Sequence, residues 1–244
     1  MNGWKGILVC SAFLCLGIAL GFALAFARPG LLRRLAKGFG LPDTNQRWMY
    51  GQMLAFHRRV DACVPDGAVL FIGDSFIEGL CVTEIADHGI NYGIGGDTTE
   101  GVLARLPAYG SLAHAGAVVF AVGDNDLRRG RTEDEVVANY RKMFAQVPKN
   151  VPVFFYSLTP CIGDAEHAEI NRGITGLNRA LKELCAAEPG RHFVDVGPAL
   201  SDDRGGLRTE FADSDGMHLN GKGYRVCIEK MRDALAQTVA GPLK

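Results

Sequence analysis

Short apolar runs alternate with amphipathic segments along most of the chain. Continuous apolar runs, which predict buried strands, occupy residues 68–72, 89–94, 117–122, 151–158 and 192–196. Patterns with apolar residues three or four positions apart, which predict helices, occupy residues 76–85, 98–106, 132–147, 168–187 and 221–239. Buried strands joined by helices are typical of a parallel sheet that is covered on both faces. The pattern therefore predicts an α/β protein with a flavodoxin-like three-layer α/β/α fold and a five-stranded parallel sheet.

One more helix is predicted at residues 43–62, ahead of the first strand. Its apolar side chains recur at helical spacing and predict a single packed face, which consists of Trp48, Met49, Met53, Phe56 and Val60. His57 stands next to Arg58 and Arg59 on another side of this helix, so we expect it to be solvated.

The chain begins with an uncharged apolar run at residues 7–26. At 1.5 Å per residue the run is long enough to cross a hydrocarbon core of about 30 Å, which predicts an N-terminal transmembrane helix. A cleaved signal peptide is the alternative, because residues 23–25 and 25–27 both fit a small-x-small cleavage site. Basic residues follow at once, which favours a retained anchor and, by the positive-inside rule, a cytoplasmic domain; they are Arg28, Arg33, Arg34 and Lys37.

The predicted organisation is thus a membrane anchor or signal peptide at residues 1–28, a connector at residues 29–42 and one domain at residues 43–244. The side of the membrane on which the domain lies stays open, since a long first apolar segment can also insert the other way. The sequence names no oligomeric state.

Composition and charge exclude several classes of protein. The chain has 26 basic and 27 acidic residues and a net charge of −1, with no basic block, so nothing indicates binding to nucleic acid. None of its seven cysteines forms a C-x-x-C pair, so the sequence predicts neither a disulfide framework nor a zinc site.

Polar residues gather immediately after the predicted strands. Residues 73–75 (Gly-Asp-Ser) follow the first strand, residues 93–99 the second, residues 123–126 the third, and residues 213–218 lie beyond the fifth. The carboxyl ends of parallel strands meet at one edge of a doubly wound sheet, where active sites lie. Several polar groups therefore converge at this edge of the sheet: a serine, a histidine, carboxylates, an asparagine and glycine amides. These are the groups that acyl transfer by a serine nucleophile requires: a base, a carboxylate that orients the base, and donors for the oxyanion.

The four segments resemble the blocks of the SGNH (GDSL-type) hydrolases, in order and from about residue 68 to residue 225. FIGDS resembles the first block, NYGIGGDTTEGVLARL the second, VGDND the third and DGMHLNGKGY the last. The second block is most similar to those of platelet-activating-factor acetylhydrolase catalytic subunits and bacterial thioesterase/lysophospholipases. The resemblance implies a catalytic triad of Ser75, Asp215 and His218. It also implies an oxyanion hole made by the backbone N–H groups of Ser75 and Gly96 and the side chain of Asn125.

The other acidic residues of these blocks are interpreted as scaffold: Asp74 in a turn, Asp97 as a helix N-cap and Asp126 as a loop brace. The alternative is that Asp74, Asp97, Asp124 and Asp126 hold Mg²⁺ for a metal-dependent phosphoesterase, and a non-catalytic binding protein on the same fold is more remote. Arg105 is expected either to pair on the surface of its helix or to steady the second block.

The sequence therefore predicts a serine esterase that hydrolyses carboxylic esters or thioesters without a cofactor or metal. The apolar N-terminus and the lipid-acting relatives favour lipid-like substrates such as lysophospholipids, and a deacetylase of O-acetylated sugars is the alternative. The loops at residues 160–167 and 197–211 are expected to line the substrate pocket.

Overall fold

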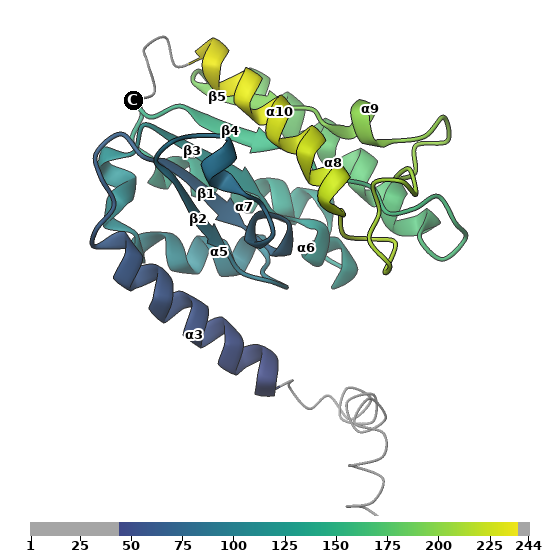
Figure 1. Ribbon diagram of the computed structural model, residues 1–244, viewed down its shortest axis with the longest axis horizontal. Coiled ribbons are helices and arrows are strands. Elements are labelled where there is room, and N and C mark those ends of the chain that lie inside the picture. The colour runs from purple at the N-terminus through teal and green to yellow at the C-terminus, as the bar shows by residue number, and fades with distance from the viewer. Residues whose placement is uncertain (1–43, 239–244) are drawn as a thin grey trace, which may run out of the picture. The chain divides into compact units, whose positions relative to one another are not determined.

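A computed structural model describes residues 44–238 and confirms the predicted α/β fold, shown in Figure 1 with the element labels used below. All five strands are parallel, and they lie in the order β2-β1-β3-β4-β5. Their bounds are Val69–Gly73 (β1), Gly89–Gly93 (β2), Ala117–Ala121 (β3), Val153–Tyr156 (β4) and Arg191–Val194 (β5). The order reverses between β1 and β3, which in a doubly wound sheet marks the crevice where ligands bind.

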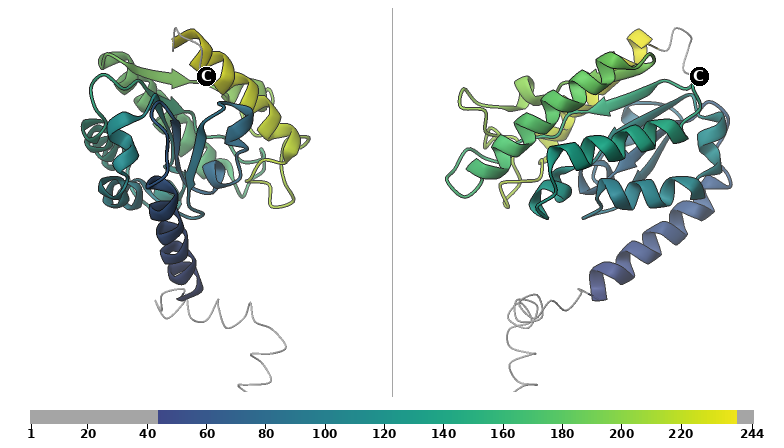
Figure 2. Two further views of the ribbon diagram at one scale, coloured as in Figure 1. Left: turned by 60° about the vertical axis from the view of Figure 1, so that its left-hand side comes forward. Right: turned by 180° about the vertical axis from the view of Figure 1, so that it is seen from behind.

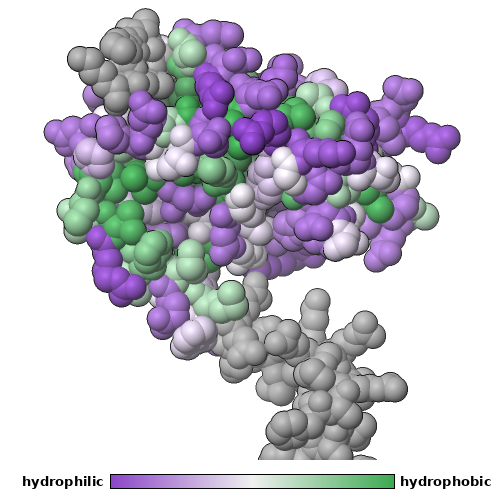
Figure 3. Space-filling model, in the orientation of Figure 1, coloured by the Kyte–Doolittle hydropathy of each residue, from purple (hydrophilic) through white to green (hydrophobic). Residues whose placement is uncertain are grey.

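Helices cover both faces of the sheet, with α10 across one face and α5, α7 and α8 on the other (Figures 1 and 2). The helices are α3 (Thr44–Asp61), α4 (Ser75–Glu78), α5 (Thr99–Arg105), α6 (Asp124–Arg128), α7 (Glu133–Gln146), α8 (Ala168–Ala187), α9 (Gly197–Leu200) and α10 (Gly221–Thr238). Short 3₁₀ turns lie at Val82–Glu84, Leu106–Ala108 and Gly110–His114. Polar residues form most of the outer side of α10, as Figure 3 shows.

The central strands contribute to two cores because successive side chains point to opposite faces of a sheet. In β3, Val118 and Phe120 pack on the side of α5, α7 and α8, whereas Val119 packs on the side of α10. All three side chains are fully buried. Burial on both faces explains why the strands appear in the sequence as continuous apolar runs rather than as alternating ones.

The predicted transmembrane helix at residues 7–26 lies outside the described residues. Within residues 44–238, no helix is both long and apolar enough to cross a membrane. The chain divides into two compact units, Met1–Gln52 and Met53–Lys244, and the whole sheet belongs to the second.

The prediction for the packed face of α3 was wrong for most of its residues. Val60 packs against the core and Met53 is half-buried, but Trp48, Met49 and Phe56 are exposed, whereas His57 is buried. Polar contacts explain the burial of this face, because His57 Nδ1 lies 3.0 Å from the hydroxyl of Tyr109 and the hydroxyl of Tyr92 donates to Asp61 at 2.8 Å. Burial, with a smaller effect from the charge of Arg105, lowers the pKa of His57 to about 4, so its ring is neutral at neutral pH.

The helix predicted at residues 76–85 is also shorter than expected, since α4 ends at Glu78. The side chain of Asn91 in β2 donates to the carbonyl oxygens of Ile77 at 2.7 Å and Leu80 at 3.1 Å. These bonds satisfy carbonyl groups that a longer helix would have paired internally. The chain can therefore turn directly after α4.

Candidate active site

The Gly-Asp-Ser segment turns the chain sharply from β1 into α4. A side chain at Gly73 would place its first carbon 2.0 Å from the carbonyl oxygen of Ala121, so only glycine fits. Asp74 caps α4, because its Oδ1 accepts the backbone N–H of Phe76 at 3.0 Å. Ser75 is the first residue of the helix and is half-buried at the carboxyl edge of the sheet. The turn thus presents the hydroxyl group at the edge where the other blocks meet.

The three residues of the predicted triad form one series of hydrogen bonds. Ser75 Oγ lies 3.0 Å from His218 Nε2, although 143 residues separate the two in the sequence. On the other side of the ring, His218 Nδ1 lies 2.5 Å from Asp215 Oδ2. The second oxygen of Asp215 accepts the backbone N–H groups of Met217 and His218, each at 2.9 Å. The carboxylate is therefore fixed by its own loop while it holds the imidazole.

These contacts set the protonation state of Asp215. Desolvation alone would raise its pKa, but the hydrogen bonds from the His218 ring and from two backbone N–H groups outweigh it and lower the pKa to about 2. Asp215 is therefore ionised throughout the pH range in which an imidazole titrates. Its charge favours the protonated ring that a base forms when it takes a proton from serine.

The glycines of the second block form a tight turn beside Ser75. Gly96 has φ +75 whereas the φ of Gly95 is negative, and Asp97 N–H donates to the carbonyl oxygen of Ile94 at 3.1 Å, which defines a type II turn. A side-chain carbon built on Gly95 would lie 4.0 Å from Ser75 Cβ. The second block therefore lies against the candidate nucleophile.

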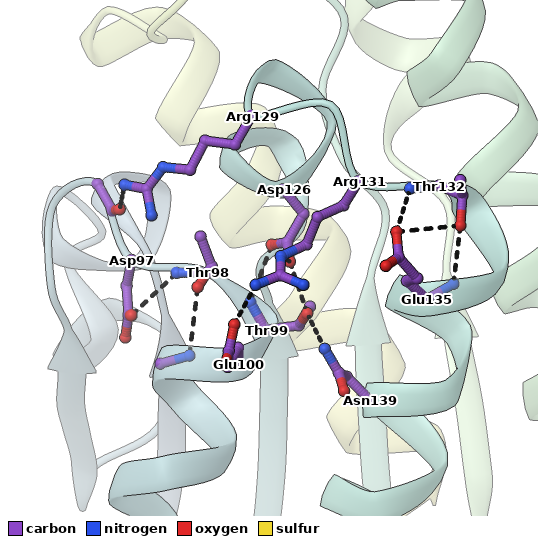
Figure 4. Close-up of polar contacts among 12 residues, drawn as sticks. Asp97, Thr98, Thr99, Glu100, Asp126, Arg129, Arg131, Thr132, Glu135 and Asn139 are labelled. Carbon is purple, nitrogen blue, oxygen red and sulfur yellow. Dashed lines mark hydrogen bonds and ion pairs between the residues drawn. The ribbon is translucent and has the colours of Figure 1, made fainter. Parts of the chain in front are cut away.

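The third block is joined to this turn by a network of polar contacts, drawn in Figure 4. The carboxylate of Asp126 accepts both the backbone N–H and the hydroxyl of Thr99, at 2.9 and 2.7 Å. Arg129, which directly follows α6, donates to the carbonyl oxygen of Gly96 at 2.7 Å. Asn125 is half-buried within α6. The two segments that carry Gly96 and Asn125 are thus held as one unit, while donation by these groups to an oxyanion stays a prediction.

A small cavity of about 40 Å³ lies at Ser75. Its lining consists of Asp74, Ser75, Phe76, Ala121, Asp124, Ser157, Leu158, Thr159, Met217 and His218. These residues come from the ends of β1, β3 and β4 and from the loop that carries His218. The loops at 160–167 and 197–211, which were expected to line the pocket, instead form a more open groove of about 470 Å³ around Ile162 and Leu207.

The scaffold residues behave partly as predicted. Asp126 braces a loop, as expected, but the N-cap of α5 is Thr98 and not Asp97. Asp97 accepts the Nε–H of Arg105 at 2.8 Å, and both side chains are buried. Arg105 is therefore not on the surface of its helix, and it steadies the second block from inside.

The acidic residues considered for a metal site each have a protein donor. Asp74, Asp97, Asp124 and Asp126 bind Phe76, Arg105, Arg128 and Thr99, respectively. Within residues 44–238, no three His, Cys, Asp or Glu side chains are grouped closely enough to hold a metal ion. No sequence pattern indicates the role of Arg128, which binds Asp124 and the buried Cys161.

A serine, a histidine and an aspartate hydrogen-bonded in series at the carboxyl edge of a parallel sheet are the arrangement of an α/β serine hydrolase. The sequence model of the GDSL-like Lipase/Acylhydrolase family matches residues 71–226, about two thirds of the chain. The chain belongs to this family and is a hydrolase that acts on ester bonds.

The individual proteins and structures that the chain resembles have low sequence identity to it. The chain is 27% identical over 202 residues to the human platelet-activating factor acetylhydrolase IB subunit alpha1. The aligned residues cover 78% of this chain and 85% of that protein. A solved structure from Streptococcus pneumonia has a TM-score of 0.71 at 24% identity and covers 84% of this chain and 98% of its own. A GDSL-like lipase from Bacteroides thetaiotaomicron has a TM-score of 0.63 at 20% identity, over 75% of this chain and 97% of its own. Likeness to the two structures shows the fold alone.

The hydrogen bonds at His218 predict a simple dependence of activity on pH. We expect kcat/KM to fall as the pH is lowered, because a protonated imidazole cannot accept the serine proton. Asp215 adds no second step there, since its pKa is near 2 and its charge is lost only as the pH falls through that value. A profile of kcat/KM against pH checks this; a rate that stays flat from pH 5 to pH 9 would show that His218 is not the base.

Proposed function

We propose that the chain hydrolyses carboxylic esters or thioesters through a covalent acyl-enzyme on Ser75. The observation that carries this proposal is the continuous series of hydrogen bonds from Ser75 through His218 to Asp215. His218 Nε2 takes the hydroxyl proton as Ser75 Oγ attacks the carbonyl carbon, and Asp215 keeps the ring in the tautomer with the proton on Nδ1. His218 then protonates the departing alcohol or thiol. It next takes a proton from the water molecule that cleaves the acyl-enzyme.

We assign the oxyanion hole to the backbone N–H groups of Ser75 and Gly96 and to the side-chain amide of Asn125. Two observations support this assignment: the Gly95–Gly96 turn lies against Ser75, and Arg129 and Asp126 join the second and third blocks. Donors that are fixed before the reaction stabilise a tetrahedral intermediate without having to reorganise.

Two substitutions test these roles with one ester. Ser75→Ala should abolish turnover of nitrophenyl acetate, and Asn125→Ala should lower kcat by about 10²–10³, the usual effect of one lost oxyanion donor. Steady-state kinetics and circular dichroism of purified variants provide the measurement. Thr175→Ala, on the exposed surface of α8, is the control and should match the wild type. If Ser75→Ala retained activity, the acyl-enzyme would be excluded; full turnover by Asn125→Ala would remove only that donor.

The cavity at Ser75 favours a short acyl group. Its volume of about 40 Å³ is room for only a few water-sized groups, since one water molecule needs roughly 10–15 Å³. Its apolar wall comes from Phe76, Ala121, Leu158 and Met217. The human and bovine relatives are named as acetylhydrolase subunits, which agrees with a two-carbon acyl group. We therefore propose acetyl esters as substrates, and lysophospholipids, whose acyl chain is long, as the alternative.

A series of nitrophenyl esters separates these two substrates. We expect kcat/KM to fall by about tenfold or more between the acetyl and the octanoyl ester, because the longer chain cannot enter the cavity without displacing its walls. The rates are compared with alkaline hydrolysis of the same esters, which corrects for their intrinsic reactivity. A kcat/KM that rises with chain length, together with turnover of a lysophospholipid, would favour the lipid alternative.

We also propose that residues 7–26 anchor the enzyme in a membrane. The support is the uncharged length of this run and the basic residues that follow it. The full chain should stay with the membrane fraction after washing at alkaline pH, and a chain that starts at residue 43 should be released. Release of the full chain, or a mature N-terminus just after residue 25 or residue 27, would instead indicate a cleaved signal peptide.

A further inference from the structure

The helix α3 carries large apolar side chains that remain exposed. Within residues 44–238 the exposed side chains of this kind are Trp48, Met49 and Phe56, which are 67%, 57% and 48% exposed and all lie on α3. Met49 and Phe56 are about two turns apart on the helix and Trp48 adjoins Met49, so the three side chains share one side of α3. A single exposed apolar residue needs no explanation, but a group on one helix indicates a surface that binds something.

The opposite side of α3 is held against the domain largely by polar groups. His57 is buried, with its Nδ1 3.0 Å from the hydroxyl of Tyr109. Asp61 accepts a hydrogen bond from the hydroxyl of Tyr92 at 2.8 Å, and Val60 adds an apolar contact with the core. The helix thus buries polar groups and presents large apolar side chains to the outside, which is the reverse of the usual arrangement for a surface helix of a globular protein.

Positive charge accompanies the exposed apolar side chains. Arg47, Arg58 and Arg59 are all exposed. The acidic residue of α3, Asp61, is engaged towards the domain by the hydrogen bond described above. The sequence from residue 28 to residue 59 has seven basic residues and one acidic residue, whereas the whole chain has 26 and 27. The surface of α3 therefore fits a partner that is negatively charged and also accepts apolar side chains.

An anionic lipid bilayer meets both requirements and lies within reach. Residues 27–43 separate the predicted membrane anchor from α3, and they span at most about 60 Å when fully extended. Headgroup phosphates attract arginine, and aromatic side chains are enriched at the boundary between headgroups and acyl chains. A second copy of the chain fits less well, because a symmetric contact through α3 would bring the arginines of both copies together.

We propose that α3 lies on the surface of an anionic phospholipid bilayer and inserts Trp48, Met49 and Phe56 among the headgroups. The three exposed arginines of the helix bind lipid phosphates there. This inference rests on the proposed membrane anchor, which brings α3 to the bilayer. It adds a second attachment, and because His57 holds α3 to the domain, this attachment restricts how freely the catalytic domain turns at the membrane.

The fluorescence of Trp48 in the full chain tests the position of α3. The sequence has two tryptophans, Trp4 and Trp48, so Trp4→Phe leaves Trp48 as the only one. This variant is reconstituted into phosphatidylcholine vesicles with and without phosphatidylglycerol, and the lipids carry bromine, a quencher, either near the start or near the end of the acyl chains. With phosphatidylglycerol present we expect a loss of Trp48 emission that is larger for bromine near the headgroups, because interfacial helices are buried by only about 5–10 Å. Acrylamide, a quencher dissolved in the water, should have little effect.

Two sets of substitutions in the same variant separate the apolar contact from the charges. Met49→Ser combined with Phe56→Ser should abolish quenching by the lipids and increase quenching by acrylamide. Replacing the three arginines of α3 by glutamine should weaken quenching by the lipids in vesicles that contain phosphatidylglycerol. The matched control changes the net charge equally by replacing exposed lysines of other helices with glutamine, and it should behave like the parent; these lysines are Lys142, Lys182 and Lys230. Unchanged turnover of nitrophenyl acetate verifies that all these variants fold.

The inference would be overturned if acrylamide quenched Trp48 freely in the reconstituted chain. It would also be overturned if neither quencher reached Trp48, since another protein surface would then cover α3, or if the arginine variant behaved like the lysine control. Failure of the anchor is distinct, because alkaline washing releases proteins that are held only at the surface and so tests residues 7–26 alone. A chain that resists this washing while brominated lipids leave Trp48 unquenched would keep the anchor and exclude the role of α3.

Discussion

The buried guanidinium of Arg105 joins the strand ends on which the candidate site is built. It donates to the carbonyl oxygens of Gly73 and Tyr92, each at 2.9 Å, to Asp97 at 2.8 Å and to the hydroxyl of Tyr109 at 2.6 Å. A buried charge is tolerated only when it is paired and hydrogen-bonded, and Arg105 uses donors on all three of its nitrogens. Gly73 lies two residues before Ser75, and Asp97 directly follows Gly96. One side chain therefore sets the relative positions of the serine and of the turn beside it.

A second brace comes from the other side of the same turn. Asp126 of the third block and Arg129, which directly follows α6, bind Thr99 and Gly96 of the second block. The turn is thus held from within by Arg105 and from the third block by these two residues. Fixed geometry matters here because donors aimed at an oxyanion stabilise charge only when they do not have to move. The braces explain why acidic and basic residues that do not take part in the proton transfer surround the site.

The parts that could be predicted from the sequence are those that follow from strand periodicity. Once the five apolar runs are assigned to parallel strands, the ends of the strands must meet, which brings the segments that carry Ser75 and His218 to one edge. The roles of the two residues come from the resemblance of the four blocks to the SGNH hydrolases. The parts that could not be predicted depend on which polar groups find partners in the core. The burial of His57 and Arg105 is caused by Tyr109, Tyr92 and Asp97, which no local pattern links to them. Likewise, the chain turns early after α4 because Asn91, on a neighbouring strand, binds the carbonyl groups of Ile77 in the helix and of Leu80 just beyond it.

Two carboxyl groups near Ser75 have opposite protonation behaviour. Hydrogen bonds outweigh desolvation at Asp215 and lower its pKa to about 2, whereas burial, helped by the charges of Asp124, Asp97 and Asp126, raises the pKa of Asp74 to about 7. Asp215 is therefore charged where an imidazolium forms on His218. Asp74, which adjoins the serine, is largely neutral below pH 7, so little negative charge lies there to repel a developing oxyanion. Environments that shift the pKa values of two acids in opposite directions give the acids different roles. Here they leave Asp215 as the carboxylate that supports the base.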